Sequence, residues 1–322
     1  MDPLHRKIIL SVLAAILTGT LLFLRDSSKK DNPSGGMPQE GCFTGAFLAD
    51  DPGRSDIKSF RNDYGKKPYY VMLFTDWKNF PNDSTIADIL KEGCRPIVTW
   101  EPWIAHSKDA IDIDSLLAGE HDDRIREFAK RLKAFDEEIL LRFAHEMNGN
   151  WYPWSGSVIG SEKYRKMYRY VKDIFDDMGA VNIKWVFSVN WEDVPAIDAN
   201  DISNYYPGGG YVDYVGIDGY NWGTSQEWSK WMSFYDIFAG IYERCVAEFG
   251  KPVIITEFSS ASDGGNKAEW IKSAMEDIKS WRQVKGFVVF NTDKEVDWKF
   301  PIAESSGQAF REAISAPHFK DK

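Results

Sequence analysis

The chain has 322 residues, of which 43% are hydrophobic, and a formal net charge of −10 at pH 7. This size allows a large core, as one barrel domain or two smaller domains, and the acidic balance argues against a nucleic-acid partner because an acidic surface repels phosphate groups. The cysteines, Cys42, Cys94 and Cys245, have no metal-ligand spacing and exclude a disulfide framework, so we expect buried free thiols, with a Cys42–Cys94 bridge as the alternative.

An apolar run from Ile8 to Leu24 follows the basic residues Arg6 and Lys7, a pattern typical of an export signal. The run is longer than most signal peptides contain and is nearly long enough to span a bilayer. Because no small-x-small cleavage site follows it, we expect residues 1–24 to be a retained signal-anchor, with a cleaved signal peptide as the alternative. The protein would then be exported, and either anchored in the cell envelope or secreted.

Residues 25–40 combine Ser, Gly, Pro and charged residues without apolar periodicity, which predicts a flexible linker before a folded domain at residues 41–322. In that domain, apolar runs alternate with amphipathic segments. Several runs are continuously apolar, as expected of parallel strands that are covered on both faces. The predicted strands are Phe43–Ala49, Tyr69–Thr75, Pro96–Trp100, Ile139–His145, Ile183–Val189, Val212–Asp218, Pro252–Glu257 and Gly286–Asn291.

Helices are predicted between these strands from apolar spacing and from their ends. We expect Ser161 to cap a helix over residues 161–178 that Gly179 ends; the others include Asp83–Leu90, Asp122–Phe135 and Lys267–Trp281. Eight β–α alternations in about 280 residues predict a single (β/α)8 TIM barrel of the α/β class. A doubly wound open sheet is the alternative, but no Gly-rich phosphate turn follows the first strand.

Polar and aromatic residues follow nearly every predicted strand, at the edge where barrel enzymes place their chemistry. The chain has 13 Trp and 14 Tyr, and these side chains stack on sugar rings while their N–H or O–H groups form hydrogen bonds. We therefore expect an acidic cleft lined with indole rings. The candidate substrate-binding residues are Trp103, Trp151, Trp191, Trp222, Trp77, Trp154 and Asn190, of which Trp77 and Trp154 are equally consistent with packing and Asn190 with holding a loop.

Glu146 follows the fourth predicted strand and Glu257 ends the seventh, each where an apolar run opens into the mouth of the barrel. Strands at these positions face each other across the barrel. Glycoside hydrolysis needs one carboxyl group that donates a proton and one that is ionised, on either side of the scissile bond. A Glu at a strand end is also a common surface or salt-bridge residue, but two of them at opposing strand ends favour a catalytic pair.

Three neighbours are predicted to support this pair. Arg142 lies four residues before Glu146, on the same strand face by alternation, and would keep a carboxylate ionised. His145 is expected to form a hydrogen bond with Glu146 or a sugar hydroxyl, and Tyr220, at the end of the sixth strand, with Glu257. The nearby acidic residues lack a His cluster or Ca²⁺-loop spacing, so we predict no metal and no cofactor.

The segment RFAHEMNGNWYPW, from Arg142 to Trp154, resembles the signature of glycoside hydrolase family 26, in which His precedes the acid/base Glu and Met-Asn-Gly and aromatic residues follow. IITEFSS, GIDGYNW and FNTDKEVDW resemble the segments at the ends of the seventh, sixth and eighth strands. The resemblance extends over residues 41–315. It implies that Glu146 is the acid/base, that Glu257 is the nucleophile, that Tyr220 contacts Glu257 and that Trp298 forms the floor of the subsite at the cleavage point.

The resemblance further implies an endo-acting β-glycan hydrolase that retains anomeric configuration, with carboxyl groups about 5–5.5 Å apart. The family includes endo-β-mannanases, mixed-linkage β-glucanases and β-1,3-xylanases. The segments after strands six and eight look closer to the β-glucanases, so a β-1,3-1,4- or β-1,4-glucan is favoured over β-mannan. We expect a monomer acting on a β-linked polysaccharide or oligosaccharide. The alternatives are a non-catalytic, envelope-tethered carbohydrate-binding barrel and a transglycosylase that remodels an exopolysaccharide.

Overall fold

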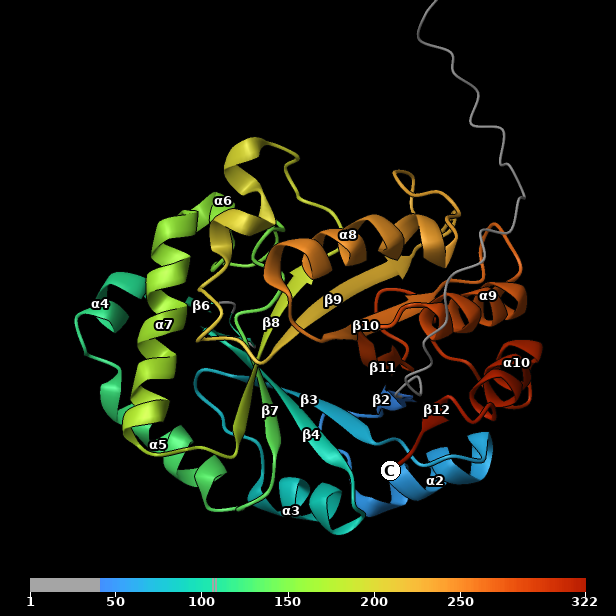
Figure 1. The fold of residues 1–322 in the computed structure, drawn as a ribbon, viewed down its shortest axis with the longest axis horizontal. Coiled ribbons are helices and arrows are strands. Elements are labelled where there is room, and N and C mark those ends of the chain that lie inside the picture. The colour runs from blue at the N-terminus through green and yellow to red at the C-terminus, as the bar shows by residue number, and fades with distance from the viewer. Residues whose placement is uncertain (1–40, 106, 108) are drawn as a thin grey trace, which may run out of the picture. The chain divides into compact units, whose positions relative to one another are not determined.

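Parallel strands surrounded by a ring of helices make up the computed structural model, which describes residues 41–322 except 106 and 108 (Figure 1). The strands are β1 (Cys42–Phe43), β2 (Gly45–Phe47), β3 (Tyr70–Asp76), β4 (Arg95–Glu101), β5 (Trp103–Ile104), β6 (Asp109–Ala110), β7 (Ile139–Phe143), β8 (Ile183–Asn190), β9 (Tyr214–Asn221), β10 (Val253–Ser260), β11 (Val284–Phe290) and β12 (Phe319–Lys320). The main sheet has the order β10-β9-β8-β7-β4-β3-β2-β11-β1-β12, and pairing of β10 with β11 closes it into a barrel.

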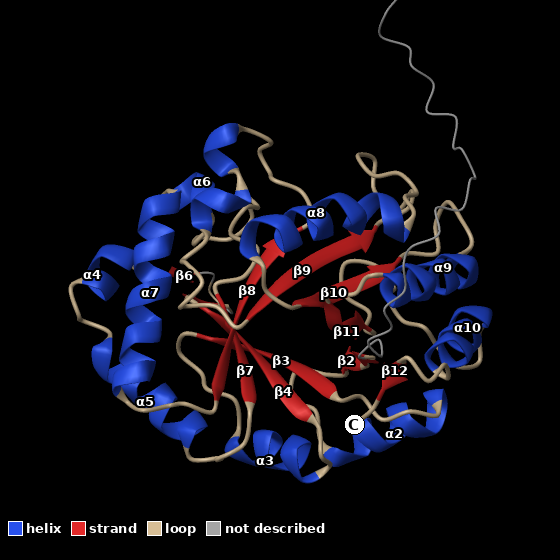
Figure 2. Ribbon diagram, in the orientation of Figure 1, coloured by secondary structure: helices blue, strands red, loops and turns tan. Residues whose placement is uncertain are grey.

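Helices lie on the outside of this barrel, between successive strands (Figure 2). They are α2 (Arg54–Tyr64), α3 (Asp83–Lys91), α4 (Ile113–Leu117), α5 (Asp122–Lys133), α6 (Gly156–Ile159), α7 (Ser161–Asp177), α8 (Phe234–Phe249), α9 (Lys267–Ser280) and α10 (Ser305–Ile314), with 3₁₀ turns η1 (Asp198–Asn200) and η2 (Ile202–Tyr205). The predicted (β/α)8 barrel is confirmed, and the eight predicted strands correspond to β2, β3, β4, β7, β8, β9, β10 and β11 within a few residues.

Three details differ from the predictions. The first strand is split into β1 and β2, and β1 pairs with the unpredicted C-terminal strand β12. Ser161 does not cap α7: the N-cap residue is Gly160, and Ser161 is the first helical residue. The end of that helix agrees with the prediction, because Gly179 has the left-handed φ of 66° that favours glycine.

The connection from β8 to β9 contains only the turns η1 and η2, so the predicted alternation lacks a regular helix here. Its sequence explains the difference. Pro195 and Pro207 lack the N–H that a helix interior requires, and three successive glycines, residues 208–210, oppose helix formation through their conformational freedom. Side-chain hydrogen bonds hold this long loop instead, as described below.

Side chains alternate between two cores along each barrel strand. On β7, Ile139, Leu141 and Phe143 pack against the helices, whereas Leu140 faces the barrel interior. The interior cluster is formed by residues from all eight strands, among them Phe47, Tyr70, Met72, Ile97, Leu140, Val186, Ile254 and Val288. The interior is therefore filled, and any substrate must bind at a rim of the barrel.

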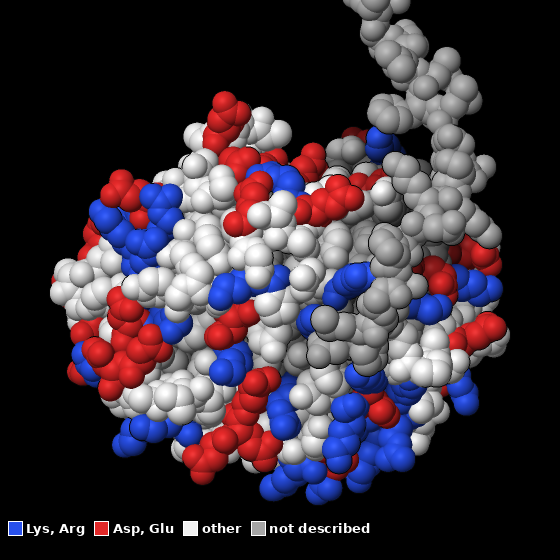
Figure 3. Space-filling view, viewed as in Figure 1, with Lys and Arg blue, Asp and Glu red and all other residues white. Residues whose placement is uncertain are grey.

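Cys42, Cys94 and Cys245 are buried free thiols, as predicted, and burial raises the pKa of Cys94 to about 11. The alternative Cys42–Cys94 bridge is wrong. Within residues 41–322, apart from the two gaps, no helix has the length and apolar character needed to cross a membrane. The predicted signal-anchor at residues 1–24 and linker at residues 25–40 lie outside the described residues. On the face shown in Figure 3, acidic and basic side chains are interspersed.

Candidate active site

A layer of polar side chains lies between the apolar interior of the barrel and the rim. It consists of Thr99, Arg142, Ser188, Asp218 and Thr256, all of them fully buried. Ser188 donates a 2.8 Å hydrogen bond to Asp218, and its oxygen lies 2.8 Å from that of Thr256. This polar layer takes residues from β4, β7, β8, β9 and β10, so it links β7, which Glu146 follows, to β10, which carries Glu257.

Arg142 is the cation of the polar layer. Its guanidinium donates hydrogen bonds to Thr99 (3.0 Å), to the Asp218 carboxylate (2.7 Å) and to Glu257 Oε1 (2.6 Å). Burial alone would lower the pKa of Arg142, but the carboxylates of Asp218 and Glu257 raise it above its ordinary value. Arg142 is therefore permanently charged, and it binds the carboxylates of Asp218 and of Glu257, the latter across the barrel.

Glu257 lies on β10, where the strand pairing is irregular. The register shifts between Ile255 and Glu257, and Glu257 pairs with Asp218 of β9. Such bulges change the direction of a side chain beside active sites. Glu257 Oε2 accepts a short hydrogen bond from the hydroxyl of Tyr220, as predicted, and Oε1 is held by Arg142. With 7% of its surface exposed, Glu257 is held firmly on both oxygens yet remains accessible from the rim.

Glu146 lies just beyond the end of β7. Ala144 and Glu146 adopt positive φ angles of 50° and 51°, which is uncommon for residues with a side chain and ends the strand at Phe143. The peptide N–H of Glu146 donates to Ser188 O (2.9 Å), and its carboxyl Oε2 accepts a 3.0 Å hydrogen bond from the indole of Trp151. The strained backbone thus carries Glu146 off the strand and into the rim.

The two carboxyl groups have different electrostatic surroundings. Burial, together with the negative charges of Asp218 and Glu257, raises the pKa of Glu146 well above its ordinary value, although Arg142 and the Trp151 hydrogen bond oppose this effect. Glu257, by contrast, shares the guanidinium of Arg142 with Asp218. Burial also raises the pKa of Asp218, to about 6, although this carboxylate pairs with Arg142. Two carboxyl groups near one cation therefore favour their protonated forms, and Glu146 is the one that lies at the rim.

His145 differs from the prediction. It is buried, and its Nε2 lies 3.2 Å from the hydroxyl of Tyr152, while neither Glu146 nor solvent is its partner. Its ring packs against Phe74, Tyr152 and Trp154. Burial and the charge of Arg142 lower the pKa of His145 well below its ordinary value, so the imidazole is neutral. His145 therefore supports the aromatic wall next to Glu146.

Four of the tryptophans predicted to bind substrate expose ring surface: Trp103, Trp151, Trp191 and Trp222. Trp77, Trp154 and Trp298 are buried, with 5%, 1% and 1% of their surface exposed. For Trp77 and Trp154 this is the packing role that was one of their two predicted roles, whereas the predicted subsite floor at Trp298 is corrected. Each of these buried rings supports another aromatic ring: Trp77 stacks on Trp100, Trp154 on Tyr152, and Trp298 contacts both Tyr220 and Trp222. The buried rings therefore stabilise the site by packing.

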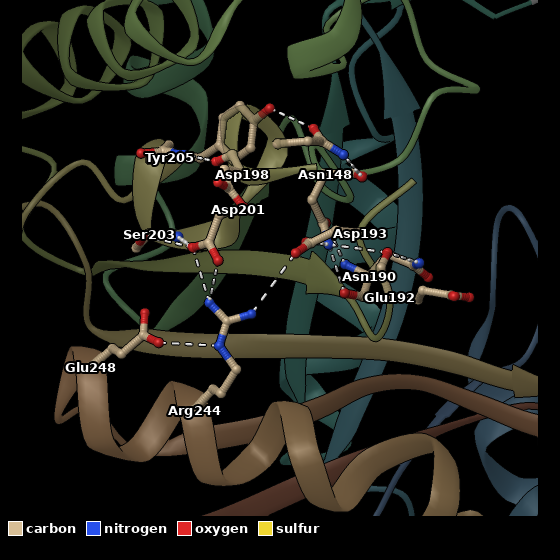
Figure 4. A network of polar contacts seen from close by, with 12 residues as sticks. Asn148, Asn190, Glu192, Asp193, Asp198, Asp201, Ser203, Tyr205, Arg244 and Glu248 are labelled. Carbon is tan, nitrogen blue, oxygen red and sulfur yellow. Dashed lines mark hydrogen bonds and ion pairs between the residues drawn. The ribbon is translucent and has the colours of Figure 1, made fainter. Parts of the chain in front are cut away.

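Asn190 holds a loop, which was one of its two predicted roles. Its side chain donates to Glu192 O (2.7 Å), and its peptide N–H donates to the side chain of Asn148 (2.9 Å). Asn148 in turn donates to Asp193, which forms an ion pair with Arg244 of α8 (Figure 4). This network connects the residue two positions after Glu146 to the helix-free β8–β9 connection.

Two further residues have roles in the site that no sequence pattern predicted. Asp218, at the end of the sixth predicted strand, pairs with Arg142 inside the barrel. Glu101, at the end of β4, is buried and accepts a 2.8 Å hydrogen bond from Trp103. Burial raises the pKa of Glu101 to about 7. Its position at a strand end next to β7 was visible in the sequence, but its burial was not.

A cavity of about 590 Å³ opens beside Glu101, and its lining includes Phe74, Asp76, Phe80 and Asn82. Asp76 accepts hydrogen bonds from the peptide N–H groups of Lys78, Asn79 and Ala105, so this carboxylate holds the loops after β3 and β4. Among the residues that the structure describes, no three His, Cys, Asp or Glu side chains are grouped to hold a metal ion.

Comparison with known sequences identifies relatives of this chain. The pattern of the family described as Glycosyl hydrolase family 26 matches residues 101–303. The chain is 38% identical over 322 residues to Endoglucanase H of Acetivibrio thermocellus, a match that covers 97% of this chain and 34% of that protein. It is 30% identical over 146 residues to a mannan endo-1,4-beta-mannosidase of Bifidobacterium adolescentis, covering 44% of this chain and 14% of that protein. The chain thus spans about a third or less of the length of these relatives.

Solved structures share the fold. A GH26 beta-mannanase from Bacteroides ovatus superposes with a TM-score of 0.67 at 16% identity, covering 88% of this chain and 90% of the other. The Bacillus subtilis mannanase man26 superposes with a TM-score of 0.62 at 18% identity, covering 85% of each chain. At these identities the comparison concerns the barrel architecture alone.

Proposed function

Because the chain belongs to glycosyl hydrolase family 26, we propose that it is an endo-acting β-glucan hydrolase that cleaves by a retaining double displacement. The observation that carries this proposal is that two carboxyl groups at one rim have different hydrogen-bond partners and different neighbouring charges. Glu257 is held by a buried guanidinium and a tyrosine hydroxyl, whereas burial and like charges favour the protonated form of Glu146. An ionised and a protonated carboxyl group are what the reaction requires.

In the first step, a carboxylate oxygen of Glu257 attacks the anomeric carbon and the glycosidic C–O bond breaks. The departing oxygen takes the proton of Glu146, so the products of this step are a glycosyl ester on Glu257 and a free sugar hydroxyl. In the second step, Glu146 accepts a proton from water, the resulting hydroxide attacks the anomeric carbon, and Glu257 leaves as a carboxylate. Both residues return to their starting states.

Arg142 and Tyr220 orient Glu257 during these steps. Their hydrogen bonds to separate oxygens restrict rotation of the carboxylate and stabilise it when it leaves the glycosyl ester. Trp151 positions Glu146 through its indole N–H and also exposes 45% of its surface, which makes the ring available to the departing sugar.

The substrate proposal rests on sequence similarity. Endoglucanase H matches along nearly the whole chain, whereas the mannan endo-1,4-beta-mannosidases of Bifidobacterium adolescentis and Bacillus subtilis match 44% and 30% of it. We therefore favour a β-1,3-1,4- or β-1,4-glucan over β-mannan.

The test is product analysis of the full-length chain on mixed-linkage β-glucan, cellulose, β-mannan and β-1,3-xylan, together with Glu146→Ala and Glu257→Ala. Glu146→Gln and Glu257→Gln serve as controls, because they keep the side-chain volume and separate loss of chemistry from loss of folding. We expect internal cleavage of a β-glucan by wild type and a large loss in every variant. Equal behaviour of wild type and variants on all four polymers would establish the non-catalytic binding barrel instead.

We also propose that the protein is exported and acts as a monomer outside the cytoplasm, where β-glucan polymers are accessible. The basis is the apolar run from Ile8 to Leu24 after Arg6 and Lys7. Cell fractionation with an antibody against the folded domain tests export, and recovery in the cytosolic fraction alone would contradict it.

A further inference from the structure

Two tryptophans are largely exposed among the described residues: Trp151 with 45% and Trp228 with 72% of their surface accessible. Trp151 follows β7 and donates to Glu146. Trp228 lies in the loop that follows β9, at residues 222–233. Both loops are at the carboxyl ends of barrel strands, which is the rim that carries Glu146 and Glu257. Trp228 has no part in the mechanism above.

Trp228 is the outermost of four aromatic rings that contact one another in succession from Glu257. The hydroxyl of Tyr220 donates to Glu257, and the Tyr220 ring lies 4.8 Å from Trp298. Trp298 lies 4.9 Å from Trp222, and Trp222 lies 5.3 Å from Trp228, between ring centroids. Trp298 is buried, Trp222 is partly exposed and Trp228 is largely exposed. The run of rings therefore leads from the predicted nucleophile to the outer part of the rim.

The loop that carries Trp228 is held at both of its ends. The side-chain oxygen of Asn221 accepts hydrogen bonds from the peptide N–H groups of Gly223 (3.2 Å) and Met232 (3.0 Å), and its amide donates to Ser260 Oγ (2.9 Å). The hydroxyl of Ser229, next to Trp228, donates to Gly223 O (2.8 Å).

A second contact joins this loop to the loop after β10. Thr224 N donates to Asp263 O (3.0 Å), and a Cβ atom on Gly223 would lie 1.9 Å from that same oxygen. Gly223 has a φ of 55°, which favours glycine. The close approach of the two loops holds Trp228 in place, so its ring is presented to solvent without the freedom of a mobile loop.

We propose that Trp228 forms an outer sugar-binding platform, on which a sugar residue of a β-glucan chain stacks several positions away from the scissile bond. An indole ring held in place binds a flat sugar face at low entropic cost. The inference rests on the proposed function, and it adds a residue that sets the preference for long over short chains. The occupant is a β-linked glucan because the run of rings is continuous with Tyr220 and Glu257.

The test measures binding separately from cleavage. Glu257→Gln in the full-length chain blocks turnover, and affinity gel electrophoresis then reports binding to mixed-linkage β-glucan, soluble substituted cellulose, β-mannan and β-1,3-xylan. In this background we expect Trp228→Ala to weaken binding of the preferred polymer about three- to tenfold. Trp228→Tyr keeps a flat ring and should stay within about twofold, as should Glu227→Gln, the matched change at the neighbouring exposed residue of the same loop.

A second measurement uses the wild-type catalytic residues and a series of β-gluco-oligosaccharides of increasing length. Trp228→Ala should lose the gain in kcat/KM that the longest chains provide and leave the shortest cleavable chain unaffected. Because Trp228 is exposed, its removal should leave the thermal unfolding temperature unchanged, which excludes misfolding as the cause.

Each outcome decides the inference. Equal binding by the Trp228→Ala variant and its parent overturns it, as does absence of binding to all four polymers. A change of oligomeric state by light scattering, with glycan binding intact, would make Trp228 a contact between copies and also overturns it. Binding that depends on Trp228 in a chain that cleaves nothing would support the platform while overturning the proposed hydrolase.

Discussion

Glu257 and Glu146 lie at the same rim, but different kinds of structure hold them. Glu257 belongs to β10, whose pairing with β9 has one register shift, and its two oxygens are bound by Arg142 and Tyr220. Glu146 lies beyond the end of its strand on a backbone with positive φ, and Trp151, from an exposed position, holds its carboxyl group. The comparison shows how one barrel gives two carboxyl groups different surroundings: a cation binds the first, and burial without an ion pair raises the pKa of the second.

The largest effects should come from removing either carboxyl group, and the two variants should then differ. Glu257→Ala should lose activity on every glycoside. Glu146→Ala should lose on the order of 10²–10⁴-fold in kcat on the polymer, yet retain activity on an aryl glycoside whose leaving group needs no proton, and azide should accelerate it by replacing water. Steady-state kinetics on both substrates checks this. Azide rescue of the Glu257 variant with the configuration retained would exchange the two assignments.

Removing the charge of Arg142 should destabilise the buried surroundings of Glu257. Arg142→Met leaves the carboxylates of Asp218 and Glu257 buried without their partner, and loss of one member of a buried ion pair costs about 3–5 kcal/mol. We expect this loss in the free energy of unfolding measured with urea. The double variant Arg142→Met/Asp218→Asn is the control, since removing one of the uncompensated charges should recover part of the loss; no recovery would show that charge balance is not the cause.

The pH dependence of kcat/KM should report the protonation of Glu146. In the proposed mechanism Glu146 acts in its protonated form, so kcat/KM should fall as the pH rises through its raised pKa. The Trp151 hydrogen bond lowers that pKa, because it favours the charged carboxylate. Trp151→Phe keeps a ring but removes the donor, and should move the alkaline limb to higher pH by up to about one unit. Glu101→Gln provides the control, because burial raises the pKa of Glu101 to about 7 and its titration could contribute to the same limb. If the alkaline limb moves in Glu101→Gln and stays in place in Trp151→Phe, the limb reports the titration of Glu101 and not that of Glu146.

The smallest effects should come from the network behind Glu146. Arg244 is partly exposed, and its ion pairs with Asp193 and Asp201 should each contribute about 0–1 kcal/mol, so Arg244→Ala should change the unfolding free energy little. Asn148→Ala should cost about 1–3 kcal/mol, because Asn148 is buried and its loss leaves backbone groups near Asn190 unpaired. Thermal unfolding of both variants checks the order. A larger loss of stability for Arg244→Ala than for Asn148→Ala would show that the ion pairs of Arg244, and not the buried Asn148, hold this loop.

Local sequence patterns predicted most of the barrel, since each buried parallel strand is a short apolar run and each strand end is polar. They also predicted the relationship to the family, which the match over residues 101–303 confirms. The missing helix between β8 and β9 was readable from Pro195, Pro207 and the glycines that follow, but the expectation of regular alternation outweighed these signals. The error at Ser161 has a similar origin, because Gly160 precedes it and takes the N-cap position.

The sequence by itself determined the strands, the order in which they follow one another, and therefore which residues reach the rim. Tertiary structure alone decided which side chains meet there: that Arg142 binds Glu257 across the barrel, that His145 contacts Tyr152, and that Trp298 is buried while Trp228 is exposed. The reason is physical. Apolar periodicity is a property of neighbouring residues, whereas burial, the partner of a charge and the resulting pKa depend on the folded structure, as for Arg142 and Glu257, which are 115 positions apart and which only the closed barrel brings together.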